Sequence, residues 1–555
     1  MSSEQPDSAT TEFHRIADQV VEDSLSFDPV GATWMGDHRG DGRLPDFSEN
    51  AQRARMQVID GALTELDAVD DVELGRSDHV DLEILRAHLT REAFELGELR
   101  ALQWNPMSWN PGTALHLLMS RDFAPAPERF ALLEGRLADI PRFLSDARDQ
   151  LRDMPGIHVE TAIAQFEGTA QLIQMAVPEM AEQQGLIIDQ GLIESAAAEV
   201  ATHLAWLTDQ LSEATASPRL DSRTYAGVLW HCLDDASNAD VLLGEAEEHL
   251  DLVTERMQEF AAEYLGVKNS HGDMVRDALT QVAAEALVRD DTVLSIVESA
   301  LQRTTDFVRR NDLVTIPETD TRVIEMPEIH RGVAVAYCDA PGPLEQADVP
   351  TYVAVSPTPN GWSPERVDSF YREYNATLLH DLTIHEAMPG HVLQLAHARQ
   401  LQSATPVRRF GFSGVFVEGW AVYAEELMLD RGYAPADTRR AALAIRLQQL
   451  KMQARMAINT ILDIRVHSME MTEAEGMELM VNRGFQEEGE ASGKWRRALL
   501  TAGQLPTYFV GYRAVTEIVH DLRVLHPDWS DRQVHDLMLS HGSPAPRHLR
   551  SLLGI

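Results

Sequence analysis

The chain has 555 residues, and its 88 acidic against 47 basic residues give a formal net charge of −41 at pH 7. Such a surface repels nucleic acids and anionic membranes, so neither is expected as a partner. A hydrophobic content of 44% is enough for a large core, or for about two to three domains.

The cysteines and the apolar runs bear on the compartment. The two cysteines, Cys232 and Cys338, are far apart in sequence, which suits a reducing compartment better than a disulfide framework. Residues 1–11 are polar and acidic, lack the apolar core of a signal peptide, and are expected to be disordered. No run of about eighteen apolar residues is present. The sequence therefore predicts a cytoplasmic protein.

The first part of the chain has apolar residues at helical spacing, and we predict that it is all helical. Its loop Trp34–Gly42 carries His38 between aspartates. A solvated turn is favoured there over a metal site, because Asp and Gly are common turn residues. The predicted helices cover residues 12–26, 48–99, 127–214, 240–266 and 272–311.

Further along the chain, the spacing of apolar residues changes from the helical pattern to the alternating pattern of β-strands. Three short runs rich in β-branched and aromatic residues are separated by Pro and Gly, at residues 322–326, 332–337 and 351–355. An edge strand beside a metal can hold an extended peptide by main-chain hydrogen bonds, and Tyr352 is a candidate substrate contact. A small ribbon that only stabilises the fold is the equal alternative.

The stretch His385-Glu386-Ala387-Met388-Pro389-Gly390-His391 carries the residue types of a zinc peptidase. Its histidines are six positions apart, not four as in H-E-x-x-H, so on an unbroken helix they would point roughly 120° apart. Proline breaks helices and glycine adopts almost any backbone angle, so we predict a bulge that brings both histidines together. Glu386 would then accept a proton from water. In the alternative, the helix ends at Pro389 and both histidines are ordinary polar residues.

A catalytic zinc ion usually has three protein ligands. Glu418 and Glu425 lie seven positions apart on the predicted helix Gly414–Met428, so they share one largely apolar face. A carboxylate buried on such a face is costly unless it is paired or bound to a metal. Glu418 is the predicted third ligand, and Glu425 is predicted to orient a histidine. A nearby arginine paired with either carboxylate is the alternative.

Two later segments supply further candidates. Asp463 and His467 share one face of a predicted helix, where they would orient the site, bind substrate, or form a plain core hydrogen bond. The segment Gly503–Arg513 holds two tyrosines one turn apart, and a phenol near the metal could stabilise an oxyanion. The candidates are Tyr508, Tyr512 and His467 as catalytic residues and Gln504 and Arg513 as substrate contacts, with helix packing as the alternative.

Together these motifs resemble a known family. The sequence contains, in order, WMGDHRGDGRLPDFS, HEAMPGHVLQ, FVEGWAVYAEELM and GQLPTYFVGY. The combination resembles the bacterial family called domain of unknown function 885 over most of the chain. That family is in turn similar to helical zinc peptidases such as the Taq-type carboxypeptidases, angiotensin-converting enzyme and the thimet oligopeptidases.

The resemblance implies a mainly helical clam-shell with a deep cleft. We therefore expect a mainly α, zincin-like (gluzincin-like) metallopeptidase fold with a small antiparallel β-ribbon beside the active-site helix. Residues 1–310 would form one wall of the cleft and residues 311–555 the catalytic region. The implied roles are His385, His391 and Glu418 as ligands of one Zn²⁺, Glu386 as the base, and Tyr508 or Tyr512 as the oxyanion partner.

The sequence thus predicts a zinc metallopeptidase, of carboxypeptidase or oligopeptidase type, that hydrolyses short peptides. Zinc is preferred over manganese or cobalt because of the ligand types. The alternative is a helical binding protein whose metal is structural or absent. Glu386 distinguishes the two, because a closed structural site needs no base beside its first histidine.

Overall fold

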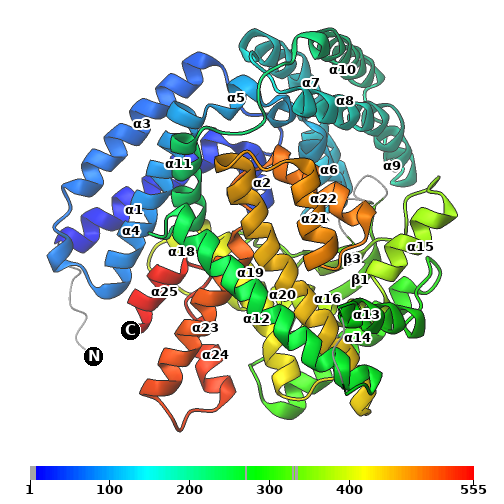
Figure 1. The fold of residues 1–555 in the computed structure, drawn as a ribbon. Coiled ribbons are helices and arrows are strands. Elements are labelled where there is room, and N and C mark those ends of the chain that lie inside the picture. The colour runs from blue at the N-terminus through cyan, green and yellow to red at the C-terminus, as the bar shows by residue number, and fades with distance from the viewer. Residues whose placement is uncertain (1–7, 269–271, 328–330, 332–334) are drawn as a thin grey trace. The chain divides into compact units, whose positions relative to one another are not determined.

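The computed structural model describes residues 8–268, 272–327, 331 and 335–555 (Figure 1). Within these residues the protein is mainly α-helical and has a single small three-stranded sheet. None of the described helices combines the length and the apolar character needed to cross a membrane.

The contacts within the chain divide it into two compact units. Unit 1 comprises Met1–Pro218, Pro341–Val349 and Gln402–Gly411. Unit 2 comprises Arg219–Ala340, Pro350–Leu401 and Phe412–Ile555. The predicted division near residue 310, between two walls of a cleft, stays a prediction.

Unit 1 is built from helices around a hydrophobic core. Trp109 is fully buried in it, and its indole N–H donates to a backbone carbonyl. The helix predicted at residues 12–26 begins earlier, so the disorder predicted at the N-terminus is wrong from Ser8 onward, and residues 1–7 lie outside the described residues. The helices of this unit are α1 (Ser8–Phe27), α2 (Pro29–Met35), α3 (Glu49–Asp67), α4 (Arg76–Phe94), α5 (Ala101–Trp104), α6 (Gly112–Ser120), α7 (Ala126–Gln150), α8 (Gly156–Gln171), α9 (Val177–Gln183), α10 (Gln190–Gln210) and α18 (Val407–Phe410).

The loop around His38 is a packed junction within unit 1. Its Nδ1 lies 2.8 Å from Asp41, and its Nε2 lies 2.8 Å from Glu345 in the segment Pro341–Val349. The ring stacks on Phe123 with centroids 3.7 Å apart. Burial alone would lower the pKa of His38, but the two carboxylates raise it. The solvated turn predicted here is therefore wrong, because long-range partners cover the loop.

Unit 2 is organised around α20 (Arg439–Ser468), which is buried along nearly its whole length. α12 (Ala239–Leu265) packs along it (Figure 1). Because neighbours surround α20, its buried residues lie on every side of the helix. The other helices of this unit are α11 (Ser222–Leu233), α13 (Met274–Glu285), α14 (Val293–Asn311), α15 (Pro364–Glu373), α16 (Ala376–Glu386), α17 (His391–Arg399), α19 (Gly414–Asp430), α21 (Glu473–Glu478), α22 (Glu488–Leu500), α23 (Thr507–Leu525), α24 (Asp531–Leu539) and α25 (Pro546–Leu553).

The sheet of unit 2 is mixed, with the order β1-β3-β2, where β1 is Thr321–Glu325, β2 is Ala336–Asp339 and β3 is Thr351–Val355. β1 pairs with β3 in parallel, whereas β2 pairs with β3 antiparallel. The predicted antiparallel ribbon is therefore wrong in its topology, because the chain reverses after β1 and again after β2. Residues 332–334 of the second predicted strand lie outside the described residues.

Two capped helices lead to the first histidine of the motif. α15 begins at a local start signal, because the Ser363 side chain accepts a backbone N–H and a proline occupies the first position. Asn375 caps α16 in the same way. The stretch before His385 is thus two helices, and each has its own start signal.

Candidate metal centre

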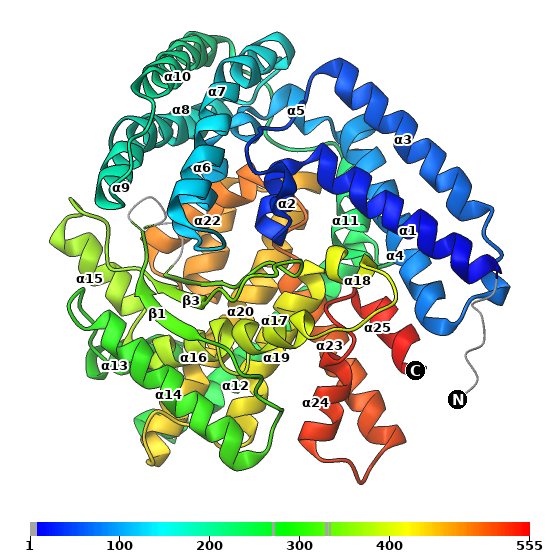
Figure 2. The same ribbon diagram turned by 180° about the vertical axis from the view of Figure 1, so that it is seen from behind.

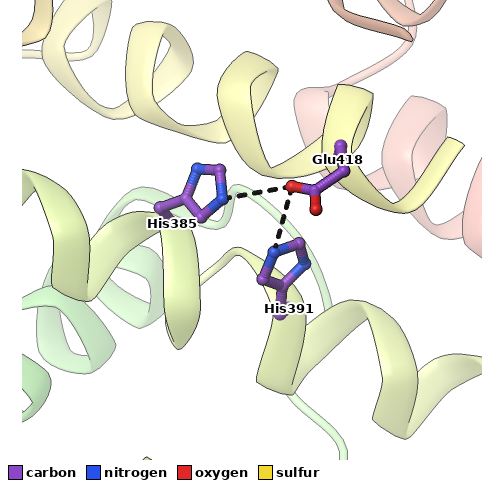
Figure 3. Close-up of side chains that lie close together, drawn as sticks. All are labelled: His385, His391 and Glu418. Atoms are coloured by element: carbon purple, nitrogen blue, oxygen red, sulfur yellow. Dashed lines mark ion pairs between the residues drawn. The ribbon is translucent and has the colours of Figure 1, made fainter. Parts of the chain in front are cut away.

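His385 and His391 are brought together by a break between two helices. α16 ends at Glu386, and α17 begins at the second histidine. The ring centroids lie 4.7 Å apart, and the ring planes are inclined by 86° (Figure 3). The helix does end before the proline, as in the sequence alternative, yet the two imidazoles converge as the predicted bulge required.

The turn between these helices depends on Gly390. Its backbone N–H donates to a carbonyl of α16 at 2.9 Å, and a Cβ on it would lie 1.8 Å from the carbonyl oxygen of His385. Its φ is −74°, so the close approach of this carbonyl, and not a positive φ, is what requires glycine here. The Met388–Pro389 peptide bond is cis. Trp420 of α19 donates its indole N–H to the proline carbonyl at 2.9 Å and ties the turn to that helix.

Glu418 of α19 reaches both histidines. Its Oε2 lies 3.4 Å from Nε2 of His385 and 3.5 Å from Nε2 of His391 (Figure 3). One ligand atom from each of the three lies within 4.8 Å of the others. Two ligands about 2.0–2.1 Å from a tetrahedral ion are roughly 3.3–3.4 Å apart, so this spacing suits zinc or a similar ion. Within the described residues no other group of His, Cys, Asp and Glu side chains meets this condition.

The charges of this group also favour a cation. Burial alone would raise the pKa of Glu418, but His385 and His391 hold it well below its usual range. Burial likewise opposes the charging of His385, but Glu418 and Glu425 raise its pKa well above the usual value. Nδ1 of His391 and Oε2 of Glu418 have no hydrogen-bond partner among the described residues. Two imidazoles and a carboxylate are a common donor set for catalytic zinc, so these residues fit such an ion.

Two further acidic side chains, Glu425 and Asp381, lie near His385. Oε1 of Glu425 lies 2.6 Å from Nδ1 of His385, a bond that fixes the ring with Nε2 toward Glu418. Asp381, which the sequence reasoning missed, is buried one helical turn before His385. Burial, followed by the charge of Glu425, raises the pKa of Asp381 well above its usual value. Its position four residues before a ligand candidate on one helix face was the available signal.

Glu386 stands beside this group without belonging to it. The backbone N–H of Cys338 in β2 donates to its carboxylate at 3.1 Å. β2 is an edge strand of the sheet, whose other two strands are labelled in Figure 2, and it contacts α16. Burial raises the pKa of Glu386, and the charges of His391 and His385 oppose that effect. A carboxylate with a raised pKa is a better proton acceptor near neutral pH.

α19 and α23 cross at two glycines. A Cβ on Gly419 would lie 2.3 Å from the backbone of Gly511, and a Cβ on Gly511 would lie 2.0 Å from the carbonyl oxygen of α19 that faces it. Glu418 immediately precedes the first glycine, and Tyr508 lies one turn before the second. Burial, and then the charge of Glu418, raise the pKa of Tyr508. The crossing thus places this predicted oxyanion partner near the candidate ligand.

Asp463 and His467 hold the turn between α22 and α23. Oδ2 of Asp463 accepts the backbone N–H of Gly503 at 2.9 Å and the hydroxyl of Tyr225 at 2.8 Å. Nε2 of His467 lies 3.1 Å from two carbonyl oxygens at the end of α22. Burial raises the pKa of Asp463 to about 7. The two residues therefore reach the metal group only through the turn that leads to Tyr508, and their predicted catalytic and orienting roles stay predictions.

The other predicted site residues have partners of their own. Tyr512 pairs with Glu426, Arg513 with Glu245 and Gln504 with Arg497. Tyr352 lies on β3, the central strand of the sheet. The structure therefore does not bring Tyr512 or Arg513 against the three candidate ligands. Their proposed contacts with a substrate stay predictions.

Known structures match this chain over nearly its whole length. The structure of a "putative lipoprotein of unknown function" from Shewanella oneidensis is 27% identical with a TM-score of 0.82, covering 98% of this chain and 100% of that chain. A "putative lipoprotein" from Colwellia psychrerythraea is 15% identical with a TM-score of 0.81, covering 99% of each chain. Trypanosoma cruzi metallocarboxypeptidase 1 is 12% identical with a TM-score of 0.40, covering 98% of this chain and 96% of that chain. No curated protein matches.

These findings correct one prediction and establish the family. The predicted cytoplasmic location is contradicted, because two structures that match nearly the whole chain are described as lipoproteins, a class anchored in cell envelopes. That prediction rested on the two cysteines, the polar N-terminal residues and the lack of a long apolar run, which do not determine where a protein is located. The family model for a "bacterial protein of unknown function (DUF885)" matches residues 29–553. The chain therefore belongs to the DUF885 family, which is the family that its motifs resemble.

Proposed function

We propose that the protein is a zinc-dependent hydrolase of peptide bonds in short peptides. The observation that carries this proposal is the buried group of His385, His391 and Glu418, with Glu386 beside it but outside it. Three protein ligands leave a fourth position for water, which is the arrangement of catalytic and not of structural zinc. A non-catalytic binding protein would have no use for a carboxylate held at that point.

The roles of the side chains follow from this arrangement. When bound, a zinc ion supplies Lewis acidity to the scissile carbonyl and lowers the pKa of a water molecule. Glu386 accepts the proton of that water and delivers it to the leaving amine nitrogen. Tyr508 donates a hydrogen bond to the substrate carbonyl oxygen as negative charge develops there. Glu425 keeps the His385 ring oriented throughout, through its hydrogen bond to Nδ1.

The sheet supports the binding of an extended peptide. β2 is an edge strand, and its Cys338 N–H already holds Glu386 in place. A substrate that added to this edge by main-chain hydrogen bonds would lie next to the proposed base. The resemblance to helical zinc peptidases favours short peptides over folded proteins as substrates.

The experiment separates metal binding from catalysis. Purified protein is analysed for bound metal and assayed against a library of short peptides, together with the variants Glu386→Gln and His391→Ala. We expect about one zinc ion per chain in the wild type and in Glu386→Gln. Only the wild type should hydrolyse peptides, and His391→Ala should lose the metal. Hydrolysis that survives in Glu386→Gln would reject the mechanism.

The matched structures also favour a cellular location for this protein. We infer that this protein acts in the cell envelope, because two structures that match it over nearly its whole length are described as lipoproteins. Fractionation of cells that produce the tagged protein tests this inference. Recovery in the envelope fraction is expected, and recovery with the cytosol would reject it.

A further inference from the structure

One face of α22 carries charged side chains that the proposed mechanism does not use. Glu490, Lys494 and Arg497 follow at intervals of four and three residues, so they share that face. Lys494 is only 8% exposed, and within the described parts of the chain its ammonium has neither a hydrogen-bond nor an ion-pair partner. The charge of Glu490 favours the ammonium form of Lys494 and burial opposes it, so a further anion at this position would stabilise the charged lysine.

Glu490, the acid whose charge acts on Lys494, is already paired with another cation. Glu490 pairs with Arg455 of α20, the helix that packs against α22. Glu373 lies 3.6 Å from Arg455 and accepts from a second lysine at 2.9 Å. Burial, and then the charges of Arg455 and Arg497, lower the pKa of Lys494 well below its usual value. An anion that bound between Lys494 and Arg497 would offset these effects and stabilise the ammonium form of Lys494.

A short series of polar side chains connects Arg497 with Tyr508, which lies near the candidate ligand Glu418. Arg497 donates from Nη2 to Oε1 of Gln504 at 2.5 Å. Gln504 lies against the hydroxyl of Tyr508 and lowers its pKa, whereas Glu418 raises it. Arg497, Gln504 and Tyr508 are each half-buried, so they remain partly accessible while Lys494 lies deeper. Arg497 is thus linked to Tyr508 through Gln504, and Lys494 lies one helical turn before Arg497 on α22.

We propose that Lys494 and Arg497 bind the C-terminal carboxylate of the peptide substrate, so that the enzyme removes residues from the C-terminus. The proposal rests on the proposed function and names the end of the chain on which it acts. An arginine and a lysine are the side chains that bind a carboxylate by charge-assisted hydrogen bonds. The C-terminal carboxylate is the one anion that every peptide carries. Because Lys494 is more than nine-tenths buried, the end of a chain can reach it where the middle of a chain cannot.

Three matched substrates test the proposal in the zinc-loaded protein. They are N-acetyl-Ala-Ala-Phe as the free acid, the same peptide as its C-terminal amide, and N-acetyl-Ala-Ala-Glu amide, which carries its carboxylate on a side chain. We expect kcat/KM to be about 10- to 150-fold higher for the free acid than for either amide, the range that one charge-assisted hydrogen bond supplies. Equal hydrolysis of acid and amide would overturn the proposal. Efficient hydrolysis of the glutamyl amide would also overturn it, because the cations would then recognise a side chain.

Variants assign the preference to the two cations. In Lys494→Met and in Arg497→Gln the ratio of kcat/KM for acid over amide should fall toward one, mainly through KM. Arg483→Met is the matched control, because that arginine is already paired with Asp251 at 2.7 Å on the surface. The control should keep the wild-type ratio. A folded Lys494→Met protein that also kept the full ratio would remove Lys494 from the site.

A binding experiment separates this proposal from the proposed function. In the Glu386→Gln variant, calorimetric titration should show the free acid binding at least about 10-fold more tightly than the amide. Tighter binding of the acid, with no hydrolysis by the wild type, would reject the hydrolase and keep the carboxylate site. Hydrolysis of acid and amide alike, with equal binding of both, would keep the hydrolase and reject the carboxylate site.

Discussion

The crossing of α19 and α23 gives the sharpest test of how the fold serves the candidate site. Gly511→Ala adds one methyl group at a point where its carbon would lie 2.0 Å from the carbonyl oxygen of Val415. Ordinary contact begins at 3.4 Å, so the helices have to separate locally by about 1.4 Å, the difference between these distances. Backbone atoms of both helices form the contact, so no side-chain rotation relieves it.

The expected effects follow from that displacement. Adding a methyl group to a tightly packed position costs about 1–3 kcal/mol of the free energy of unfolding. A shift of about 1 Å between groups that act on the same substrate can lower a rate by roughly 10²-fold. Because α19 carries Glu418 and α23 carries Tyr508, peptide hydrolysis by Gly511→Ala should fall by that order. Zinc should still bind, because α23 supplies no candidate ligand.

The assay compares urea unfolding, zinc content and peptide hydrolysis in three proteins. The control is Gly244→Ala in α12, an exposed helical glycine where an added Cβ would have no other heavy atom within 4 Å. Alanine there should stabilise the protein by about 0.5–1 kcal/mol, because it has the higher helix propensity. A Gly511→Ala protein as stable and as active as the wild type would refute the reasoning about the crossing.

Three further predictions concern the histidines and the turn before α23. In Glu425→Gln the His385 ring loses its charged partner, so the affinity for zinc should fall about 10- to 100-fold. Competition with a chelator measures this affinity, and an unchanged value would count against an orienting role of Glu425. Gly390→Ala should abolish zinc binding while leaving a largely helical circular dichroism spectrum, since its methyl carbon would lie 1.8 Å from a carbonyl oxygen; full zinc binding would contradict the geometry. Asp463 has a raised pKa, of about 7, so the folded state binds a proton that the unfolded state has released between about pH 4 and 7. The free energy of unfolding should therefore fall by about a few kcal/mol as pH rises through this window. Urea titrations at several pH values should show a smaller fall in Asp463→Asn than in the wild type. The same dependence of unfolding free energy on pH in both proteins would refute this reasoning.

The sequence by itself determined the features that depend on neighbours along the chain. Apolar residues at helical spacing identified most helices, and the start signal of α15, a capping Ser363 followed by proline, is local in the sequence. Residue chemistry was equally local: imidazoles and carboxylates are metal ligands wherever they meet. The candidate group of His385, His391 and Glu418 was therefore predictable as a set of residue types.

Only the tertiary structure decided how distant parts of the chain meet. Local rules allowed the two histidines to converge or to diverge, and the close contact of Gly390 with a backbone carbonyl settled the choice. Strand pairing also depended on the tertiary structure, because hydrophobic alternation does not reveal which strands are neighbours or in which direction they run. The burial of the Asp381 and Lys494 side chains was also not predictable from the sequence. Their burial depends on packing from several sides by helices that are distant in sequence, which no local pattern encodes.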